Sequence, residues 1–291
     1  MSAGRYAPSP SGDLHVGNLR TALLAWLFAR STGRSFLMRV EDLDRVRPSA
    51  EEQQLDDLRA LGIEWDGHIV RQSDRQALYD DAIDRLTDAG RVYPCFCTRR
   101  EILDAPSAPH TPPGTYPGTC RDLTYAERAR RSAERPAALR LRSDVDAWTV
   151  TDVLHGEVTG TVDDLVLRRN DGVPAYNLAV VVDDSAQGVD QVVRGDDLLT
   201  SASRQAYLAT LLEHEPPTYA HVPLALNTGG QRLAKRDGAV TRAELEARGV
   251  DVLALIVDSL GLAGTTPTEL LDSFDPQRLP RDPWTVVPPQ G

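Results

Sequence analysis

A histidine and a glycine stand two residues apart in a loop near the start of the chain. The loop, residues 8–18, reads PSPSGDLHVGN. Free N–H groups where a helix begins attract phosphate. His15 can donate to phosphate oxygens, and Gly17 leaves room for a ring or a phosphate because it lacks a side chain. The loop matches neither the G-x-G-x-x-G nor the Walker pattern. The alternative is a helix-initiating loop with an incidental histidine.

A second loop, residues 229–238, concentrates positive charge in an acidic protein. It reads GGQRLAKRDG, with Arg232, Lys235 and Arg236 inside five residues and glycine at both ends. Cations between flexible glycines suit a lid over a polyphosphate. The alternative is a solvated basic turn.

The three cysteines of the chain, Cys95, Cys97 and Cys120, lie within 26 residues of one another. Three cysteines cannot form a closed set of disulfides, so their clustering favours a metal site. Three buried thiols without a metal are the alternative.

Composition limits the class of protein. The 291 residues carry a net charge of −11 and are 41% apolar, which is typical of a globular protein and excludes disorder for most of the chain. No apolar run is long enough to span a membrane, and residues 1–5 lack a signal-peptide core, so we expect a cytoplasmic protein without a membrane partner. The acidic balance argues against general binding of nucleic-acid backbone but leaves room for one local basic face.

Strands and helices alternate in the first third of the chain, which predicts a parallel sheet with crossover helices and a ligand site at its carboxyl edge. Two helices should begin at capping boxes, SAEE at residues 49–52 and SDRQ at residues 73–76. The predicted elements of this part are strands at 5–7 and 36–40 and helices at 19–32, 49–61 and 73–89, each helix being closed by the glycine at 33, 62 or 90.

The regular alternation stops at residue 95, and the segment to about residue 136 looks like an insertion. Beyond it, NDG at residues 170–172 predicts a hairpin between residues 166–168 and 175–182. The last 25 or so residues are rich in proline, which predicts an irregular tail. The other predicted elements are strands at 139–142, 191–193 and 221–224 and helices at 201–213 and 242–260.

Together, the two loops resemble the HIGH and KMSKS signatures of class I aminoacyl-tRNA synthetases. They read HVGN at residues 15–18 and RLAKR at residues 232–236. RYAPSPSG at residues 5–12 and RVEDLD at residues 39–44 are similar to the glutamyl subgroup. The resemblance extends from about residue 4 to residue 260.

Within that subgroup, the chain resembles the glutamyl-Q tRNA(Asp) synthetase family, which are truncated paralogues of glutamyl-tRNA synthetase. Only 55 residues follow Arg236, too few for an anticodon-reading region. The resemblance implies an α/β fold with a class I Rossmann-type parallel sheet, a zinc-containing insertion, a short helical C-terminal extension and no anticodon-binding domain. The implied parts are catalytic halves at 1–94 and 137–240, the insertion at 95–136 and a helical, Pro-rich tail at 241–291.

The resemblance also implies an activity. Members of the family activate L-glutamate with ATP to glutamyl-adenylate and attach the glutamate to the queuosine base in the anticodon of tRNA(Asp). It further suggests a monomer. Two alternatives stay open: a truncated glutamyl-tRNA synthetase that charges the 3′ end of tRNA(Glu), and a catalytically silent module that binds glutamate or tRNA. The absent anticodon region disfavours the first, and the presence of His15, Lys235 and a carboxylate pocket disfavours the second.

For the glutamate site, the resemblance implies roles that chemistry supports. Arg5 and Arg194 suit a substrate carboxylate because a planar guanidinium can pair with it in two places. Glu41 can pair with the substrate ammonium, and the ring of Tyr176 can wall the pocket. Surface ion pairs and core packing are the alternatives for single residues. The full implied set is Arg5, Tyr6, Ala7, Pro8, Ser9, Glu41, Tyr176 and Arg194.

For ATP, the implied catalytic residues are His15, Gly17 and Lys235, where Lys235 contacts phosphates, with Asn18 and Arg232 beside them. Mg²⁺ should accompany ATP, held largely by phosphates and water. These roles require residues 15 and 235 to border one cleft. The chain departs from the signatures at four positions: Asn18, Arg232, Ala234 and Arg236.

The resemblance implies one structural zinc held by Cys95, Cys97, Tyr116 and Cys120, which would close a tetrahedron. His110 competes with Tyr116 for the fourth place, since imidazole is the better donor. Arginines make this insertion locally basic and suggest an RNA-facing surface, although a solvated helix face is an equal alternative for residues 128–135. These arginines are Arg99, Arg100, Arg121, Arg128, Arg130 and Arg131.

Overall fold

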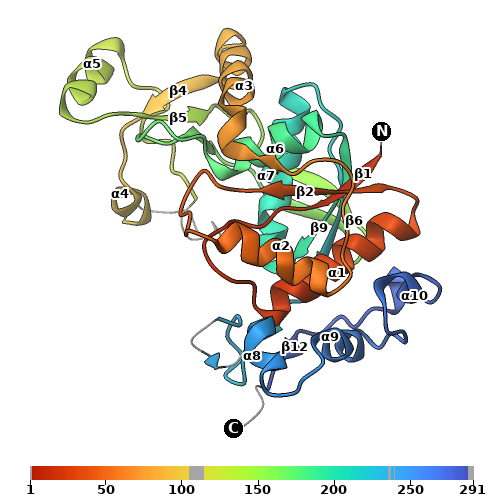
Figure 1. The fold of residues 1–291 in the computed structure, drawn as a ribbon. Helices are drawn as coiled ribbons and strands as arrows, with labels where there is room; N and C mark the ends of the chain where they lie inside the picture. The colour runs from red at the N-terminus through yellow and green to blue at the C-terminus, as the bar shows by residue number, and fades with distance from the viewer. Residues whose placement is uncertain (1, 105–114, 235–236, 239, 288–291) are drawn as a thin grey trace.

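A seven-stranded, mostly parallel sheet runs through the computed structural model, which describes residues 2–104, 115–234, 237–238 and 240–287 (Figure 1). The strand order is β3-β2-β1-β9-β10-β6-β7, and only the β6–β7 pair at one edge is antiparallel. The α/β prediction is therefore confirmed. The strands of this sheet are Ala3–Tyr6 (β1), Ser35–Val40 (β2), Val70–Arg71 (β3), Ala147–Asp152 (β6), Gly156–Thr161 (β7), Val189–Gly195 (β9) and Thr218–Val222 (β10).

The neighbours β1 and β9 define the place where a ligand can bind. β1 pairs in parallel with β2 on one side and with β9 on the other. The chain leaves β1 toward β2 and leaves β9 toward β10, so the strand order reverses between them. Open α/β sheets bind ligands outside the carboxyl ends of the strands at such a switch point.

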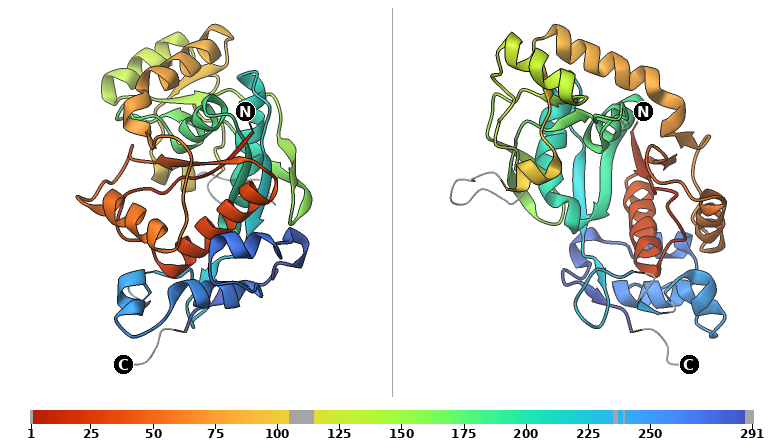
Figure 2. Two further views of the ribbon diagram at one scale, coloured as in Figure 1. Left: turned by 45° about the vertical axis from the view of Figure 1, so that its right-hand side comes forward. Right: turned by 90° about the vertical axis from the view of Figure 1, so that its left-hand side faces the viewer.

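Helices cover both faces of this sheet (Figure 2). α1 contributes most of one core, together with α2, α9 and α10, whereas α6 and α7 pack on the opposite face. The helices are Val16–Ser31 (α1), Ala50–Ala60 (α2), Gln76–Asp88 (α3), Arg99–Leu103 (α4), Tyr125–Glu134 (α5), Tyr176–Ala186 (α6), Leu199–Leu211 (α7), Arg242–Glu246 (α8), Val252–Leu260 (α9) and Pro267–Leu271 (α10), with 3₁₀ turns at Gln72–Arg75, Asp196–Leu198 and Pro276–Arg278.

The first three predicted helices are confirmed, but two of their predicted caps are wrong. Ser49 precedes α2 with a φ of 62° and caps nothing with its side chain. The Ser73 hydroxyl donates to Asp42, and α3 begins only at Gln76 after a 3₁₀ turn. In both cases the serine lies in a turn fixed by its surroundings, which overrides the local motif.

The predicted hairpin at residues 166–182 is only partly present: the chain turns back and Arg168 forms an isolated antiparallel bridge with Pro174. Val166–Arg168 is a strand (β8), but the apolar run after the turn forms α6. A short apolar run can serve as a buried strand or a buried helix, and periodicity alone cannot separate them.

The C-terminal part is more regular than predicted. Gly249, with a φ of 75°, separates α8 from α9, so the expected single helix is two. The Pro-rich tail was predicted to be irregular. It contains α10 and a strand, Trp284–Thr285 (β12), that pairs with Ala225–Leu226 (β11). The β6–β7 hairpin was not anticipated.

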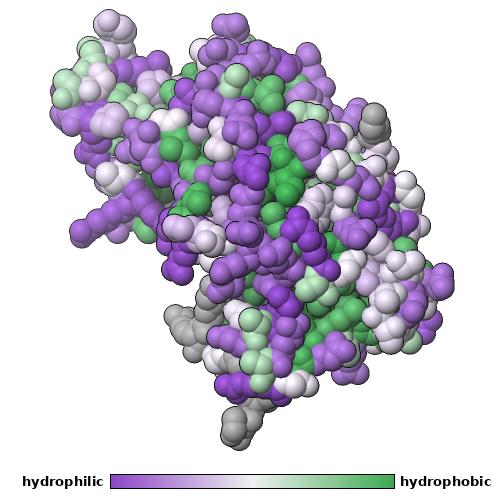
Figure 3. All heavy atoms as spheres, viewed as in Figure 1, coloured by the Kyte–Doolittle hydropathy of each residue, from purple (hydrophilic) through white to green (hydrophobic). Residues whose placement is uncertain are grey.

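Around the cysteines, β4 (Val92–Cys95), β5 (Ala138–Leu141) and β8 form a separate antiparallel sheet. This sheet, α4 and α5 lie at the end of the molecule opposite α8, α9 and α10 (Figure 1). The face drawn in Figure 3 is mostly hydrophilic. Among the described helices, none combines the length and the hydropathy needed to cross a membrane.

Candidate active-site cleft and metal centre

A cavity of about 790 Å³ opens at the carboxyl ends of β1 and β9. It lies where the strand order predicts a ligand site. Lys235, the remaining predicted residue, is outside the described residues, although its neighbour Ala234 lines the cavity. The predicted residues that line the cavity are Arg5, Tyr6, Ala7, Pro8, Ser9, His15, Gly17, Asn18, Glu41, Tyr176, Arg194 and Arg232.

The segment that follows the basic loop is tied to the histidine loop and to the start of α1. The Val16 N–H donates to the Val240 carbonyl at 2.8 Å, and His15 forms an isolated β-bridge with Thr241. Within the basic loop, the Leu233 N–H donates to the carbonyl of Ala225 on β11 at 3.0 Å, and Gly17 of α1 lies against the same residue. Two stretches of chain far apart in sequence therefore border one cleft.

His15 begins α1 as its N-cap. The Asn18 N–H donates to His15 Nδ1 and the His15 N–H donates to Asn18 Oδ1, both at 3.2 Å. Asn18, which replaces the second histidine of the signature, thus completes a reciprocal cap. Because Nδ1 accepts a hydrogen bond, the proton of the neutral imidazole is on Nε2. This arrangement gives His15 a donor suited to phosphate oxygens.

Gly17 is required by packing against the protein itself. A Cβ at this position would lie 2.5 Å from the Ala225 Cβ and 3.1 Å from the His15 ring. The space expected for a nucleotide is therefore partly occupied by β11. Any side chain here would push β11 or the imidazole away from its place at the cleft.

Arg232 stands at the mouth of the cleft. Its Nη1 pairs with Asp197 Oδ2 at 2.6 Å, and 61% of its side chain remains exposed. Asp237 fixes the far side of the loop: one oxygen accepts from the Asn227 side chain at 3.0 Å and the other from the Ala234 N–H at 2.7 Å. Among the described residues, this end of the cleft is thus bordered by an exposed loop that side-chain contacts of Asp197 and Asp237 hold in place.

The opposite end of the cleft is a buried network of charges. Arg5 Nε pairs with Asp184 at 3.3 Å, and Arg39 Nη1 pairs with the same carboxylate at 2.7 Å. Arg39 also reaches Asp183 at 3.7 Å and Glu41 at 3.5 Å. Burial raises the pKa of Glu41, while Arg39 and Arg5 oppose that rise. These pairs keep each buried charge balanced.

The supporting residues Arg39, Asp183 and Asp184 were missed as site residues. Arg39 stands inside the RVEDLD motif, and the acidic pair directly follows the apolar run of α6. Adjacent carboxylates beside a strongly apolar segment are a signal of buried, paired charge. The apolar run also fits a strand of a hairpin, and that interpretation hides the signal.

Arg194, the second predicted carboxylate ligand, is 5% exposed and has other partners. Its Nε donates to His221 Nε2 at 3.0 Å and its Nη1 to Gln205 Oε1 at 2.7 Å. Tyr176, the first residue of α6, lines the same end with 42% of its surface exposed. An exposed ring at a cavity wall can contact a ligand.

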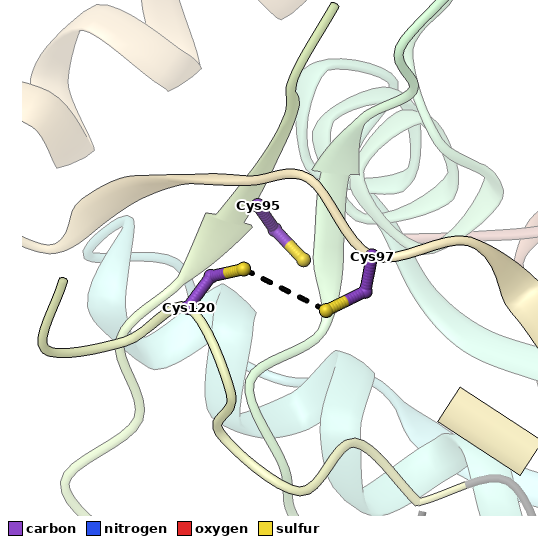
Figure 4. Close-up of side chains that lie close together, drawn as sticks. All are labelled: Cys95, Cys97 and Cys120. Carbon is purple, nitrogen blue, oxygen red and sulfur yellow. Dashed lines mark hydrogen bonds between the residues drawn. The ribbon is translucent and has the colours of Figure 1, made fainter. Parts of the chain in front are cut away.

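The three cysteines converge on a point in the insertion (Figure 4). Their Sγ atoms all lie within 4.8 Å of one another, with Cys97 and Cys120 at 3.6 Å. Two sulfurs bound to one tetrahedral zinc at about 2.3 Å are roughly 3.8 Å apart. The cluster therefore has the dimensions of a zinc site.

Tyr116 lies beside these thiols. Its Oη is 3.3 Å from Cys95 Sγ and 3.9 Å from Cys97 Sγ, and it accepts from the Cys120 N–H at 2.8 Å. The competing candidate His110 is outside the described residues. Burial, together with the neighbouring Cys95, raises the pKa of Cys97 to about 12. A divalent cation reverses this preference by binding thiolates, so the donor set suits zinc.

Some of the predicted RNA-facing arginines have partners within the protein. Arg121 is held by Asp164 at 2.8 Å, and Arg131 Nη1 donates to Cys120 Sγ at 3.7 Å. Arg130 is exposed on α5, a helix with no buried residue, and the neighbouring Tyr125 is also exposed. An RNA-facing role for this helix stays a prediction.

Comparison with known proteins shows the class of protein to which this fold and cleft belong. Residues 3–285 match the family model described as "tRNA synthetases class I (E and Q), catalytic domain". The chain shares 26% identity and a TM-score of 0.82 with the crystal structure of a glutamate tRNA ligase from Elizabethkingia meningosepticum CCUG26117 in complex with its amino acid, covering 99% of this chain and 67% of that one. Fold and site together define a class I tRNA synthetase catalytic domain.

Two relatives show to which family within this class the chain belongs. The chain is 67% identical to the glutamyl-Q tRNA(Asp) synthetase of Nocardia farcinica, covering 98% of this chain and 93% of the relative. It is 53% identical to the protein of the same name from Cutibacterium acnes, covering 94% of this chain and 80% of that relative. The chain belongs to the glutamyl-Q tRNA(Asp) synthetase family.

Proposed function

We propose that this protein activates L-glutamate with ATP to form glutamyl-adenylate and transfers the glutamate to the queuosine base in the anticodon of tRNA(Asp). One observation carries the proposal: a single cleft has buried arginines at one end and the His15 and Arg232 loops at the other. An amino acid with a side-chain carboxylate and a triphosphate can lie in it end to end. The close relatives bear the name of this activity.

At the glutamate end, one carboxylate of the substrate must face ATP in order to react. The side-chain carboxylate is therefore the one directed to Arg5 and Arg194, which can pair with it through planar guanidinium groups. Glu41 takes the ammonium, and Tyr176 walls the pocket. The backbone of residues 5–9 borders the same ligand.

At the nucleotide end, His15 donates from Nε2 to phosphate oxygens, and the N-terminus of α1 adds its N–H groups. Asn18 acts by holding His15, and Gly17 by letting α1 approach β11. Arg232 and Lys235 supply positive charge to the phosphates. The role of Lys235 rests on the sequence motif, since it lies outside the described residues.

The reaction needs no nucleophile from the protein. A glutamate carboxylate oxygen forms a bond to the α-phosphorus of ATP, and the bond to pyrophosphate breaks in line. A nucleophile on the queuosine base then attacks the activated carbonyl, and AMP leaves. The residues of the cleft act by positioning and by stabilising charge on the phosphoryl oxygens. Mg²⁺ accompanies ATP and is held largely by phosphates and water.

The thiol cluster holds one structural zinc through Cys95, Cys97, Tyr116 and Cys120. Four protein donors leave no open position for catalysis. We expect the purified protein to contain about one equivalent of zinc and Cys95→Ser to lose it. Elemental analysis of both proteins checks this, and an unchanged zinc content would support three buried thiols without a metal.

The substrate is tested by a transfer assay with radiolabelled glutamate and three RNAs: queuosine-containing tRNA(Asp), queuosine-free tRNA(Asp) and tRNA(Glu). We expect labelling of the first alone, by a monomeric protein acting in the cytoplasm. Labelling of the 3′ end of tRNA(Glu) would instead indicate a truncated glutamyl-tRNA synthetase. Labelling of none would indicate a silent binding module.

A further inference from the structure

The two buried arginines of the glutamate end are anchored in different ways. Arg5 pairs with the carboxylate of Asp184. The partners that the described part of the chain gives Arg194 are all neutral: the imidazole of His221, the amide of Gln205, the carbonyl of Leu198 at 3.3 Å from Nη2, and the ring of Tyr219, whose centroid lies 5.4 Å from Cζ. Among the described residues, no carboxylate lies within ion-pairing distance of Arg194. Arg194 is thus buried with its charge uncompensated by an ion pair.

His221 is fully buried near the end of β10. Asp152 orients its ring from the side opposite Arg194. The Nδ1 of His221 lies 2.6 Å from Asp152 Oδ2, which also accepts the His221 N–H at 3.0 Å. The other oxygen of Asp152 accepts the N–H groups of Leu154 and His155. A carboxylate held by backbone donors takes the Nδ1 proton of His221 as a hydrogen bond, which leaves Nε2 as an acceptor for Arg194.

The imidazole is neutral in this position. Burial lowers the pKa of His221, and the positive charge of Arg194 lowers it further against the opposing effect of Asp152. An imidazolium would turn a donor toward the Arg194 guanidinium and add a like charge beside it. The groups packed around the ring are Arg194, Asp152, His155 and the stacked ring of Tyr219.

We propose that His221 is a positioning residue, which holds Arg194 in place without neutralising it and thereby makes the cleft select an amino acid with an anionic side chain over its uncharged amide. An arginine anchored by a carboxylate offers a ligand only part of its charge. An arginine anchored by an imidazole offers all of it. This inference rests on the proposed glutamate activation.

Two substitutions of His221 distinguish a role in orienting Arg194 from a role in general packing. In His221→Asn the amide can still donate to Asp152 but is too short to reach Arg194, whereas in His221→Gln the carbonyl oxygen extends to about the place of Nε2. We expect His221→Asn to raise the KM for glutamate about tenfold, the cost of one lost hydrogen bond to a charged group, with the KM for ATP changing less than about twofold. His221→Gln should restore most of the glutamate KM.

A third substitution tests the charge directly. Gln205→Glu places a carboxylate against Arg194 in an isosteric side chain that can still pair with it. We expect a higher glutamate KM and a fall of about tenfold in the ratio of kcat/KM for glutamate to that for glutamine. His68→Asn, on an exposed histidine, is the matched control and should change neither constant.

Calorimetric titration of glutamate, without ATP, accompanies the kinetics and keeps the two proposals apart. If the wild type activates glutamate but His221→Asn and Gln205→Glu bind it as tightly as the wild type, the positioning role is wrong. If glutamate and ATP constants rise together, His221 serves general packing and the role is also wrong. If the wild type neither binds nor activates glutamate, the proposed function itself fails.

Discussion

The two ends of the cleft are built in different ways. At the proposed glutamate end, Arg5, Arg39 and Arg194 are each at most 5% exposed and are fixed by buried partners on α6, α7 and β10. At the proposed nucleotide end, Arg232 is mostly exposed and pairs with Asp197 at the surface. The glutamate end is therefore preorganised by the core, while the nucleotide end is borne by surface loops.

This difference between a buried end and an exposed end fits the function that we propose for each. Recognition of a small amino acid needs fixed groups, because looser placement lowers both affinity and discrimination. Transfer of a phosphoryl group needs cations that follow charge as it moves to the leaving pyrophosphate. Substitutions at the two ends of the cleft should accordingly affect different properties of the protein.

The largest effect should come from removing a buried charge at the glutamate end. Asp184→Asn leaves Arg5 and Arg39 without their shared partner, which should cost about 3–5 kcal/mol of unfolding free energy. Denaturant unfolding measures this. Asp190→Asn is the control, because its half-exposed pair with Arg34 should be worth only about 0–1 kcal/mol. Equal losses in the two variants would contradict a preorganised glutamate end.

At the nucleotide end, Lys235→Ala should slow activation without weakening glutamate binding. Removal of one group that stabilises transition-state charge typically lowers kcat by about 10²–10³. Steady-state pyrophosphate exchange gives both constants. A steep rise in glutamate KM at constant kcat would show that the assignment of Lys235 is wrong.

A smaller effect is expected where the start of α1 meets β11. Gly17→Ala should cost about 1–3 kcal/mol of stability because the new methyl group collides with Ala225. The KM for ATP should rise and that for glutamate should not. The double variant Gly17→Ala with Ala225→Gly removes the colliding methyl group and should recover much of both losses. If the double variant is as impaired as the single one, the collision is not the cause.

The smallest effect concerns pH. Because burial lowers the pKa of His221, the unfolded chain binds a proton on this histidine at a higher pH than the folded protein does. Stability should therefore decrease as pH falls below about 6.5, the ordinary histidine value. His221→Gln should show a shallower decrease in unfolding free energy between pH 7 and 5. Parallel profiles for the two proteins would contradict a neutral buried imidazole.

Local signals in the sequence predicted the sheet and the thiol cluster, whereas the residues of the cleft came from the resemblance to a known family. Strand–helix alternation and short motifs such as HVGN can be recognised in the sequence without knowledge of distant contacts. The supporting residues were not predictable in this way. Asp184 and His221 act on arginines that lie far from them in sequence, and no local pattern joins them.

The errors have a common physical origin. Ser49 and Ser73 carry capping motifs but lie in turns set by neighbouring segments. The run at residues 175–182 is apolar enough for either a strand or a helix, and its packing against α7 and β8 decides for a helix. Tertiary contacts outweigh local preference in each case.

The central claim is that one cleft joins a fixed carboxylate pocket to a phosphate-binding end. It is tested most directly by amino-acid-dependent exchange of pyrophosphate into ATP, measured without tRNA for glutamate, glutamine and aspartate. We predict rapid exchange with glutamate and little with the other two. Exchange as fast with glutamine as with glutamate, or none with any amino acid, would contradict the account.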